Sequence, residues 1–262
     1  MINKPASEKM RIIHDTKRPM LTDYINELFT DFTELHGDRY FSDDHAILGG
    51  VGYFNGTPVT VIGHRKGRTI EQNMDANFGM AHPEGYRKAL RLAHQAEKFH
   101  RPVICLVDTP GAFCGMEAEE RGQGEAIARN LYEMSSLKTP VLTIVISEGG
   151  SGGALALAVA DEVWMMQNAI YSILSPEGFA SILWKDGKRA PEAAEVMKLT
   201  ARDLKELGIV EEIVAEPEEF TVETLPAVCG DLRRKILKFM GKYAELDAEE
   251  LVEERYRRFR EI

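Results

Sequence analysis

Two apolar patterns alternate along the chain. Residues 102–107 and 141–146 form nearly unbroken apolar runs, which are typical of strands that are buried on both faces. Apolar positions three and four residues apart predict amphipathic helices at 21–29 and 83–99, and a further helix is expected at 125–137. The alternation of buried strands with helices predicts an α/β protein.

A β-hairpin is predicted before the first of these buried strands. Residues 47–54 and 57–63 are short apolar runs joined by Asn55 and Gly56. An Asn-Gly pair suits the two-residue turn of a hairpin, because both residue types tolerate positive φ. We therefore expect two antiparallel strands in this region.

The second half of the chain continues the alternation with shorter segments. The predicted elements are a helix at 154–160, strands at 163–166 and 170–174, helices that begin at Ser175 and Thr200, a strand at 209–214 and charged helices over 230–262. Residues 185–192 are expected to form a polar loop. On the helix at 83–99, Arg87, Lys88 and Arg91 lie off the apolar face and are expected to be solvated.

Both long buried strands lead into a glycine-containing turn and then a helix. We call residues 109–113 the first turn and residues 149–153 the second turn. Strand–turn–helix–strand connections of this kind are right-handed crossovers that bring parallel strands together. The two turns are therefore expected to lie side by side at the carboxyl ends of their strands, where α/β folds bind ligands.

The second turn is unusually rich in glycine. Gly149, Gly150, Gly152 and Gly153 occupy four of its five positions. Glycine permits positive φ and lets a ligand approach the backbone, and the first amides of a helix lack partners within that helix. The pattern favours a binding site over an ordinary tight turn.

Three specific interpretations of the second turn can be compared. A P-loop is excluded, because no Lys-Ser or Lys-Thr follows the glycines. Ser151 completes the G-x-S-x-G pattern of α/β-hydrolases, but all seven histidines precede it, whereas that fold places its histidine last. A serine protease with another chain order stays open. The third interpretation is an oxyanion hole built from backbone amides.

Composition and charge narrow the class of protein. The 262 residues carry a net charge of −10, with 44% apolar and 28% charged residues, as in ordinary globular proteins. Such a charge argues against DNA or an anionic membrane as the main partner. The cluster from His64 to Arg68 is locally basic, and could contact the phosphates of an anionic ligand.

Cysteine usage and apolar runs indicate the compartment. Cys105, Cys114 and Cys229 are scattered, so neither a disulfide framework nor a zinc site is predicted. The first 20 residues lack the apolar core of a signal peptide, and no apolar run reaches 18 residues. We expect a cytoplasmic protein.

Six short motifs occur together in one order. They lie at residues 77–80, 83–91, 108–112, 119–123, 147–156 and 175–178. Each motif alone is weak, but the ordered set resembles the family of α subunits of bacterial acetyl-CoA carboxylase carboxyltransferase. The resemblance covers about residues 18–262.

The resemblance implies a fold and an activity. The fold is a crotonase-like (ClpP/crotonase) superhelix of ββα units with peripheral N- and C-terminal helices. We expect a helical segment at 1–45, the carboxyltransferase core at 46–225 and C-terminal helices at 226–262. The implied reaction moves a carboxyl group from carboxybiotin to acetyl-CoA, and gives malonyl-CoA for fatty acid biosynthesis.

The resemblance also implies partners. These are a carboxyltransferase β subunit in an α2β2 heterotetramer, the biotin carboxyl carrier protein that bears the biotin, and a separate biotin carboxylase. The zinc ribbon of such complexes belongs to the β subunit, so no metal is expected on this chain. Neither a DNA-binding role nor a membrane association is expected.

Two departures from the family pattern stand out. Most of the N-terminal helical extension of many α subunits is expected to be missing, together with its contacts. Residues 113–116 read Phe-Cys-Gly-Met, where relatives often carry proline and smaller residues. We expect this change to alter the lip of the site.

The candidate site residues follow from the turns and the resemblance. The backbone oxyanion donors are expected among Gly149, Gly150, Gly152 and Gly153, together with Gly111 and Ala112. Register with the crotonase pattern favours Gly152, and the Gly149–Gly150 pair is the alternative. Ser151 then has a turn role. The expected substrate-binding residues are Arg121, Gln123, Arg65 and Lys66, of which the first two could orient the loop.

Two rival functions stay open at this point. A self-contained hydratase or decarboxylase of the same fold would use a side-chain acid or base, for which Glu119, Glu120 and Glu148 are candidates. A non-enzymatic scaffold is the other rival, and the glycine turns argue against it. The residues favour neither assignment of the biotin and thioester oxygens to the two turns.

Overall fold

The structure is a computed structural model that describes residues 4–261. The helices are α1 (Ala6–Ile12), α2 (Leu21–Leu28), α3 (Ile70–Asp75), α4 (Pro83–Lys98), α5 (Met116–Glu120), α6 (Gln123–Ser135), α7 (Ser151–Leu155), α8 (Pro176–Trp184), α9 (Ala190–Val196), α10 (Ala201–Glu206), α11 (Leu225–Ala244) and α12 (Ala248–Glu261), with the short 3-10 helices η1 (Asn77–Gly79) and η2 (Gly187–Arg189). The strands are β1 (Thr30–Glu34), β2 (Ile47–Phe54), β3 (Thr57–His64), β4 (Val103–Thr109), β5 (Val141–Gly150), β6 (Glu162–Met166), β7 (Ile170–Ser172) and β8 (Glu212–Val214).

One mixed sheet organises these elements. Its strand order is β1-β2-β3-β4-β5-β6-β8, and β7 pairs with the far end of β5. The pairs among β1, β2 and β3 are antiparallel, whereas β3 to β8 run parallel to their neighbours. The predicted hairpin is confirmed, with Asn55 and Gly56 both at positive φ in its turn. The predicted α/β class with adjacent parallel strands is likewise confirmed.

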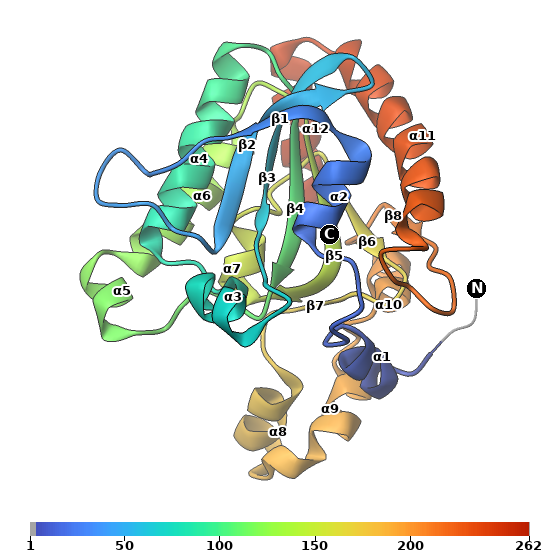
Figure 1. Cartoon of the computed structure of the whole chain (residues 1–262). Coiled ribbons are helices and arrows are strands. Elements are labelled where there is room, and N and C mark those ends of the chain that lie inside the picture. The colour runs from blue at the N-terminus through green and yellow to red at the C-terminus, as the bar shows by residue number, and fades with distance from the viewer. Residues whose placement is uncertain (1–3, 262) are drawn as a thin grey trace.

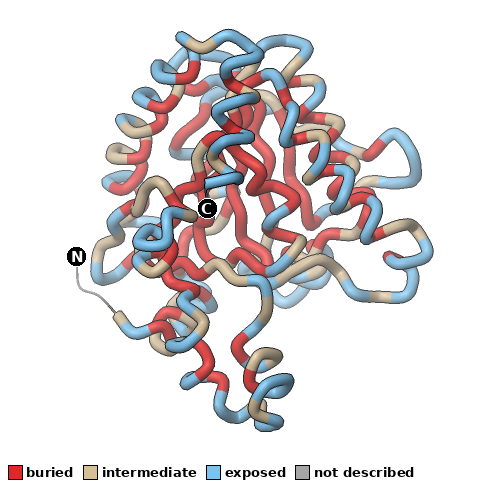
Figure 2. Tube along the Cα trace, turned by 180° about the vertical axis from the view of Figure 1, so that it is seen from behind, coloured by how far each residue is buried: buried red, intermediate tan, exposed pale blue. Residues whose placement is uncertain are grey.

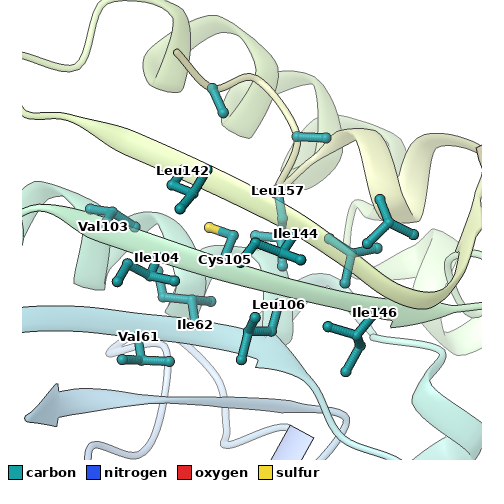
Figure 3. Close-up of a cluster of buried hydrophobic side chains, with 14 of the residues drawn as sticks. Val61, Ile62, Val103, Ile104, Cys105, Leu106, Leu142, Ile144, Ile146 and Leu157 are labelled. Atoms are coloured by element: carbon teal, nitrogen blue, oxygen red, sulfur yellow. The ribbon is translucent and has the colours of Figure 1, made fainter. Parts of the chain in front are cut away.

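The core lies where the central strands are covered on both faces. All seven residues of β4 are buried, and side chains of β3, β4 and β5 interdigitate around Ile62, Cys105 and Ile144 (Figure 3). Each such aliphatic side chain contributes about 1.5–3 kcal/mol by leaving water. The central strands are buried and the helices turn exposed faces outward (Figure 2).

Helices cover opposite faces of the sheet (Figure 1). Leu92 of α4 lies where a side chain on Gly49 would project, and Leu21 of α2 lies where one on Gly63 would project. Gly49 pairs with Ile62, the neighbour of Gly63, so the two leucines approach opposite faces. α6 packs beside α4, and α11 packs against α2. The main core includes residues from Leu21 to Leu251, and the expected three-part division stays a prediction.

α8 and α9 form an arm that extends away from the sheet (Figure 1). α1 packs against α9 and joins a second, smaller apolar cluster with Ile170 and Leu199. The prediction of a loop at 185–192 was wrong, because η2 and the start of α9 occupy these residues. Pro191 stands in the first turn of α9, where its missing N–H costs nothing.

Two further predictions need correction. The helix predicted at 154–160 is α7, which begins earlier and ends at Leu155. Lys88 is not solvated: its side chain is fully buried, and its ammonium donates to Asp43 (2.6 Å) and to the Asp44 carbonyl (2.7 Å). A charged group at a buried helix position needs such partners. Within residues 4–261, none of the helices combines the length and the apolar character needed to cross a bilayer.

Candidate active site

The two glycine turns lie against each other at the carboxyl ends of β4 and β5. Thr109 is in register with Gly149 across the two parallel strands. A Cβ on Gly150 would lie 2.0 Å from the Pro110 carbonyl oxygen, and one on Gly153 would lie 2.6 Å from the Ala112 nitrogen. Both distances are too short for any side chain, so glycine permits the close approach. The expectation that the turns lie side by side is confirmed.

Backbone amides of both turns are available as donors. In the first turn, Thr109 Oγ1 accepts from Gly111 N (3.0 Å) and the Ala81 carbonyl accepts from Phe113 N (3.0 Å). Ala112 N, between them, has no acceptor among the described residues. In the second turn, Gly152 N at the start of α7 likewise has none within residues 4–261.

Burial separates the candidate donors. Gly149 and Gly150 are buried in the β5 ladder, in register with Tyr171 and Ser172 of β7. Gly153 is buried as well, whereas Gly152 and Ala112 are partly exposed. Gly152 also has room, since the nearest atom to its Cβ position is Ile127 Cγ2 at 3.5 Å. The geometry therefore favours Gly152 and Ala112 as the pair of donors that a ligand can reach.

Side chains hold the first turn from two sides. Thr109 Oγ1 donates to the Gly111 carbonyl at 2.8 Å while it accepts from Gly111 N. The buried Gln123 amide donates to both the Phe113 and the Ala81 carbonyls, each at 2.8 Å. The expected role of Gln123 in orienting the loop agrees with these bonds. Its role in substrate binding stays a prediction.

A buried charge cluster lies directly beside the turns. Lys66 Nζ contacts Asp108 Oδ1 (2.7 Å) and Glu148 Oε2 (3.3 Å), and His14 approaches Glu148 at 3.7 Å. Burial opposes the charged ammonium, but the two carboxylates outweigh it and raise the pKa of Lys66. These residues line a cavity of about 290 Å³ that also touches Pro110.

The other predicted cations are paired within the chain. Arg65 pairs with Glu34, and Arg68, the last residue of the basic cluster, pairs with Asp23 (2.5 Å). Arg121 pairs with Glu84 (2.9 Å) and lies over the Phe41 ring. The basic cluster is thus neutralised locally, and contacts of Arg65, Lys66 and Arg121 with a substrate stay predictions.

The structure places the candidate acids and the serine away from nucleophilic or acid–base roles. Glu119 and Glu120 are exposed on α5. Burial favours a protonated Glu148, but His14 and Lys66 outweigh it and lower the pKa of this carboxyl. Ser151 is exposed at positive φ, and its hydroxyl bonds to no histidine among the described residues. No three His, Cys, Asp or Glu side chains within 4–261 gather as a metal site would need.

Sequence reasoning missed several residues near the turns. His14 reaches Glu148 from the N-terminal segment, and no local pattern indicates that contact. Tyr86 and His64 lie against the backbone of Gly153. Tyr86 is one of the buried residues of α4, and the helical pattern at 83–99 does not show where its hydroxyl lies. Phe113, on the lip, stacks on His82 with ring centroids 4.2 Å apart.

Comparison with known proteins identifies the family of this chain. Residues 3–262 match the family model described as acetyl co-enzyme A carboxylase carboxyltransferase-like. The chain is 57% identical over 255 residues to the acetyl-coenzyme A carboxylase carboxyl transferase subunit alpha of Clostridium acetobutylicum, covering 97% of this chain and 93% of that protein. It is 55% identical to the acetyl-coenzyme A carboxylase carboxyl transferase subunits beta/alpha of Natranaerobius thermophilus. That alignment covers 97% of this chain and 42% of the Natranaerobius protein.

Solved structures share the fold. The chain superposes on transcarboxylase 12S with a TM-score of 0.72 at 21% identity, covering 92% of this chain and 45% of that one. It superposes on the beta subunit of geranyl-CoA carboxylase from P. aeruginosa with a TM-score of 0.67 at 15% identity, with the same coverage of 92% and 45%. The expected crotonase-like fold is confirmed. From its sequence match, the chain belongs to the acetyl-CoA carboxylase carboxyltransferase family.

Proposed function

We propose that the chain is the α subunit of an acetyl-CoA carboxylase carboxyltransferase. Its reaction moves the carboxyl group of carboxybiotin, held on a biotin carboxyl carrier protein, to acetyl-CoA and gives malonyl-CoA. The family match and the relatives' names support the assignment. The single structural observation that carries it is the close approach of two turns that each hold one partly exposed amide without an acceptor among the described residues, Ala112 N and Gly152 N.

Free amides in adjacent turns suit the charge that this reaction would develop. When bound, carboxybiotin would supply the carboxyl group, and its ureido oxygen and the thioester oxygen of acetyl-CoA are the atoms whose negative charge the amides would stabilise. A fixed backbone donor aimed at such an oxygen contributes about 3 kcal/mol to the transition state. The proposed transfer would need no nucleophile from the chain, which agrees with the Ser151 hydroxyl that bonds to no histidine among the described residues. Biotin supplies the carboxyl carrier chemistry, and the amides would hold its oxygen.

The supporting side chains have positioning tasks in this proposal. Thr109 and Gln123 fix the first turn, so that Ala112 N keeps its direction without reorganisation. Arg121 stabilises the neighbouring segment through Glu84. Lys66 joins the ends of β4 and β5, because Asp108 accepts from both Lys66 Nζ and, at 3.4 Å, Glu148 N. Arg65 and Lys66 would meet CoA phosphates or the carrier only after exchanging their present carboxylate partners.

A β subunit completes the proposed enzyme. The Natranaerobius relative is a single beta/alpha chain, and this chain matches 42% of it, which supports a partnership between the two parts. We place the chain in an α2β2 heterotetramer that works with the carrier protein and a separate biotin carboxylase. Residues of the β subunit would then complete each oxyanion site.

The first experiment measures malonyl-CoA decarboxylation and carboxyl transfer to biocytin. The chain is assayed alone and then with a β subunit from a relative with separate subunits. Activity only in the mixture is the expected result. Activity of the chain alone would support the rival hydratase or decarboxylase class, and an inactive mixture that still assembles would support a scaffold.

A substitution at Gly152 tests the site itself. Gly152→Leu places a side chain beside the free amide, in a position with room for it, so we expect a loss of about 100-fold or more in transfer. Assembly with the β subunit should persist. Gly241→Leu on α11 is the matched control, because nothing lies within 4 Å of its Cβ position. Equal activities of the two variants would contradict a role for Gly152.

A further inference from the structure

Among the fully buried side chains that lack a hydrogen-bond partner in the described residues, two lie near the glycine turns. They are Tyr86 on α4, through its hydroxyl, and His64 at the end of β3, through both ring nitrogens. Buried polar groups are almost always paired, so an unpaired group in a native core calls for an explanation. Burial lowers the pKa of His64 to about 3, with the charge of Lys66 as a smaller cause, so its ring is neutral and retains one donor and one acceptor.

Both side chains lie near Gly153 of the second turn. The point where Gly153 would carry a Cβ lies 2.9 Å from the Tyr86 hydroxyl, 2.6 Å from Ala112 N and 2.7 Å from the Gly111 carbonyl carbon. The hydroxyl is therefore a close neighbour of the peptide that joins Gly111 to Ala112. His64 lies against the backbone of Gly153 without a hydrogen bond of ordinary geometry.

The orientation of that peptide links it to the chemistry. The N–H and C=O of one peptide group point in opposite directions. When Ala112 N–H points at a ligand oxygen, the Gly111 carbonyl points the other way; it already accepts from Thr109 Oγ1 (2.8 Å) and has a second lone pair for another donor. A hydrogen bond to that carbonyl polarises the peptide and strengthens its N–H as a donor. Gly111 has a φ of 149°, and α7 spans only five residues, so neither turn is locked by a long helix.

We propose that Tyr86 and His64 are positioning residues for the oxyanion donors, with hydrogen-bonding capacity that is unused in the resting chain and is engaged when the turns hold a charged oxygen. Tyr86 acts on the Gly111–Ala112 peptide, and His64 acts on the backbone of Gly153. Neither side chain touches the reacting atoms. The inference rests on the proposed carboxyl transfer, and it adds to that same site two side chains that position its backbone donors.

The test compares two chemically identical substitutions. Tyr86→Phe removes the hydroxyl and keeps the ring. Tyr24→Phe is the matched control, because the Tyr24 hydroxyl is also fully buried and unpaired among residues 4–261, but α2 packs against α11 rather than α7. Both variants lose an unpaired polar group, so the Tm of each should stay constant or rise by about 2 °C.

Activity then separates the two variants. In the complex with a β subunit, Tyr86→Phe should lower kcat about tenfold, the effect of one ordinary hydrogen bond, with KM for malonyl-CoA within about twofold. Tyr24→Phe should keep kcat. For the second residue, His64→Leu should lower kcat, and His64→Gln should recover part of it, because the amide restores a donor and an acceptor.

Two results would overturn the proposal. A Tm for Tyr86→Phe several degrees below that of Tyr24→Phe would show that the hydroxyl has a partner in the resting protein, and this comparison needs no activity. An unchanged kcat for Tyr86→Phe in an active complex would show that the hydroxyl does not serve the donors. An inactive wild-type complex would instead contradict the proposed function, so the two failures are distinguishable.

Discussion

The two ends of β5 lie in one core but differ in how fully the polar groups around them are hydrogen-bonded. At the amino end, Arg255 of α12 uses all its N–H groups: Asp161 accepts two, and the carbonyls of Met134, Leu137 and Thr139 accept the rest, all within 2.7–3.0 Å. Asp161 also accepts from Val141 N. We call this set the amino-end cluster. It joins α12, the end of α6 and the start of β5.

The carboxyl end of β5 leaves hydrogen-bonding capacity unused. Ala112 N and Gly152 N lack acceptors in the described part of the chain, and the Tyr86 and His64 side chains behind them are unpaired there. The difference shows how the fold divides its tasks. Paired groups at the amino end stabilise the sheet, and that stability permits unpaired donors at the other end, which in the proposed function engage a substrate oxygen.

The largest effect is expected from breaking the amino-end cluster. Arg255→Met leaves Asp161 as a buried carboxylate without its cation, so the free energy of unfolding should fall by about 3–5 kcal/mol. Urea denaturation measures this loss. Arg257→Met is the control. Arg257 is exposed and its ion pair with Glu253 is long, at 3.9 Å, so its loss should change the free energy of unfolding by less than about 0.5 kcal/mol. Similar losses in both variants would contradict the structural role of the cluster.

Forcing the two turns apart should lower activity much more than stability, which is the opposite of what is expected for the amino-end cluster. A Cβ at Gly150 would collide with the Pro110 carbonyl, so Gly150→Ala should cost about 1–3 kcal/mol of stability. Carboxyl transfer should fall about 100-fold or more, because the donors lose their relative placement. Gly241→Ala, with nothing near its Cβ position, should leave both quantities near wild type. A stable, fully active Gly150→Ala variant would refute the contact between the turns.

The pH dependence of the free energy of unfolding should reveal the pairing of Asp43 with Lys88 of α4. Burial opposes ionisation of Asp43, but hydrogen bonds from Lys88, Gly37 and His36 outweigh it and hold its pKa well below the usual range. Because the pKa is lower in the folded chain, this contribution is complete above about pH 4 and is lost as the pH falls toward the folded value.

Asp43→Asn tests that sign directly. Between about pH 6 and pH 3, wild type should lose about 1–2 kcal/mol more stability than the variant, as measured by urea midpoints at each pH. Asp75→Asn is a useful comparison, because its carboxylate is 60% exposed and contacts only His45. Parallel pH profiles for wild type and Asp43→Asn would contradict the lowered pKa.

The smallest predicted effect is a difference in activity between variants of two buried threonines, Thr109 and Thr143. Thr109→Val removes the hydroxyl that holds Gly111, and should cost about 1 kcal/mol of stability and about threefold to tenfold of activity. Thr143→Val removes a buried hydroxyl that donates to the Leu157 carbonyl in the core, with a similar cost in stability. Its activity should stay near wild type. Equal activities would show that the Thr109 hydroxyl serves folding alone.

Local patterns were sufficient for the central strands and for the turns, but not for β1, which lies within the segment expected to be helical. Unbroken apolar runs predicted β4 and β5, Asn55-Gly56 predicted the hairpin, and the glycines at 149–153 marked the second turn. These features depend on neighbours in the sequence. The adjacency of the turns followed from the chirality of crossover connections, so it too could be predicted.

Contacts between distant segments could not be predicted. Asp43 and Lys88, like Asp161 and Arg255, are charged residues whose burial depends on a partner far along the chain. Lys88 was therefore assigned to a solvated face, since a charged residue on a helix is usually exposed. The choice of Gly152 over the Gly149–Gly150 pair also needed structure, because pairing between β5 and β7 is what buries the latter two.

The contact between Gly150 and the Pro110 backbone limits how this site can change over evolution. In the proposed function its chemistry is carried by main-chain amides, which every residue type except proline possesses, while the identity of the glycines is set by a lack of space. Side-chain exchange at these positions cannot create a new specificity without separating the turns. Adaptation to another acyl group must therefore act through the surrounding lip, where Phe113, Cys114 and Met116 are partly or largely exposed.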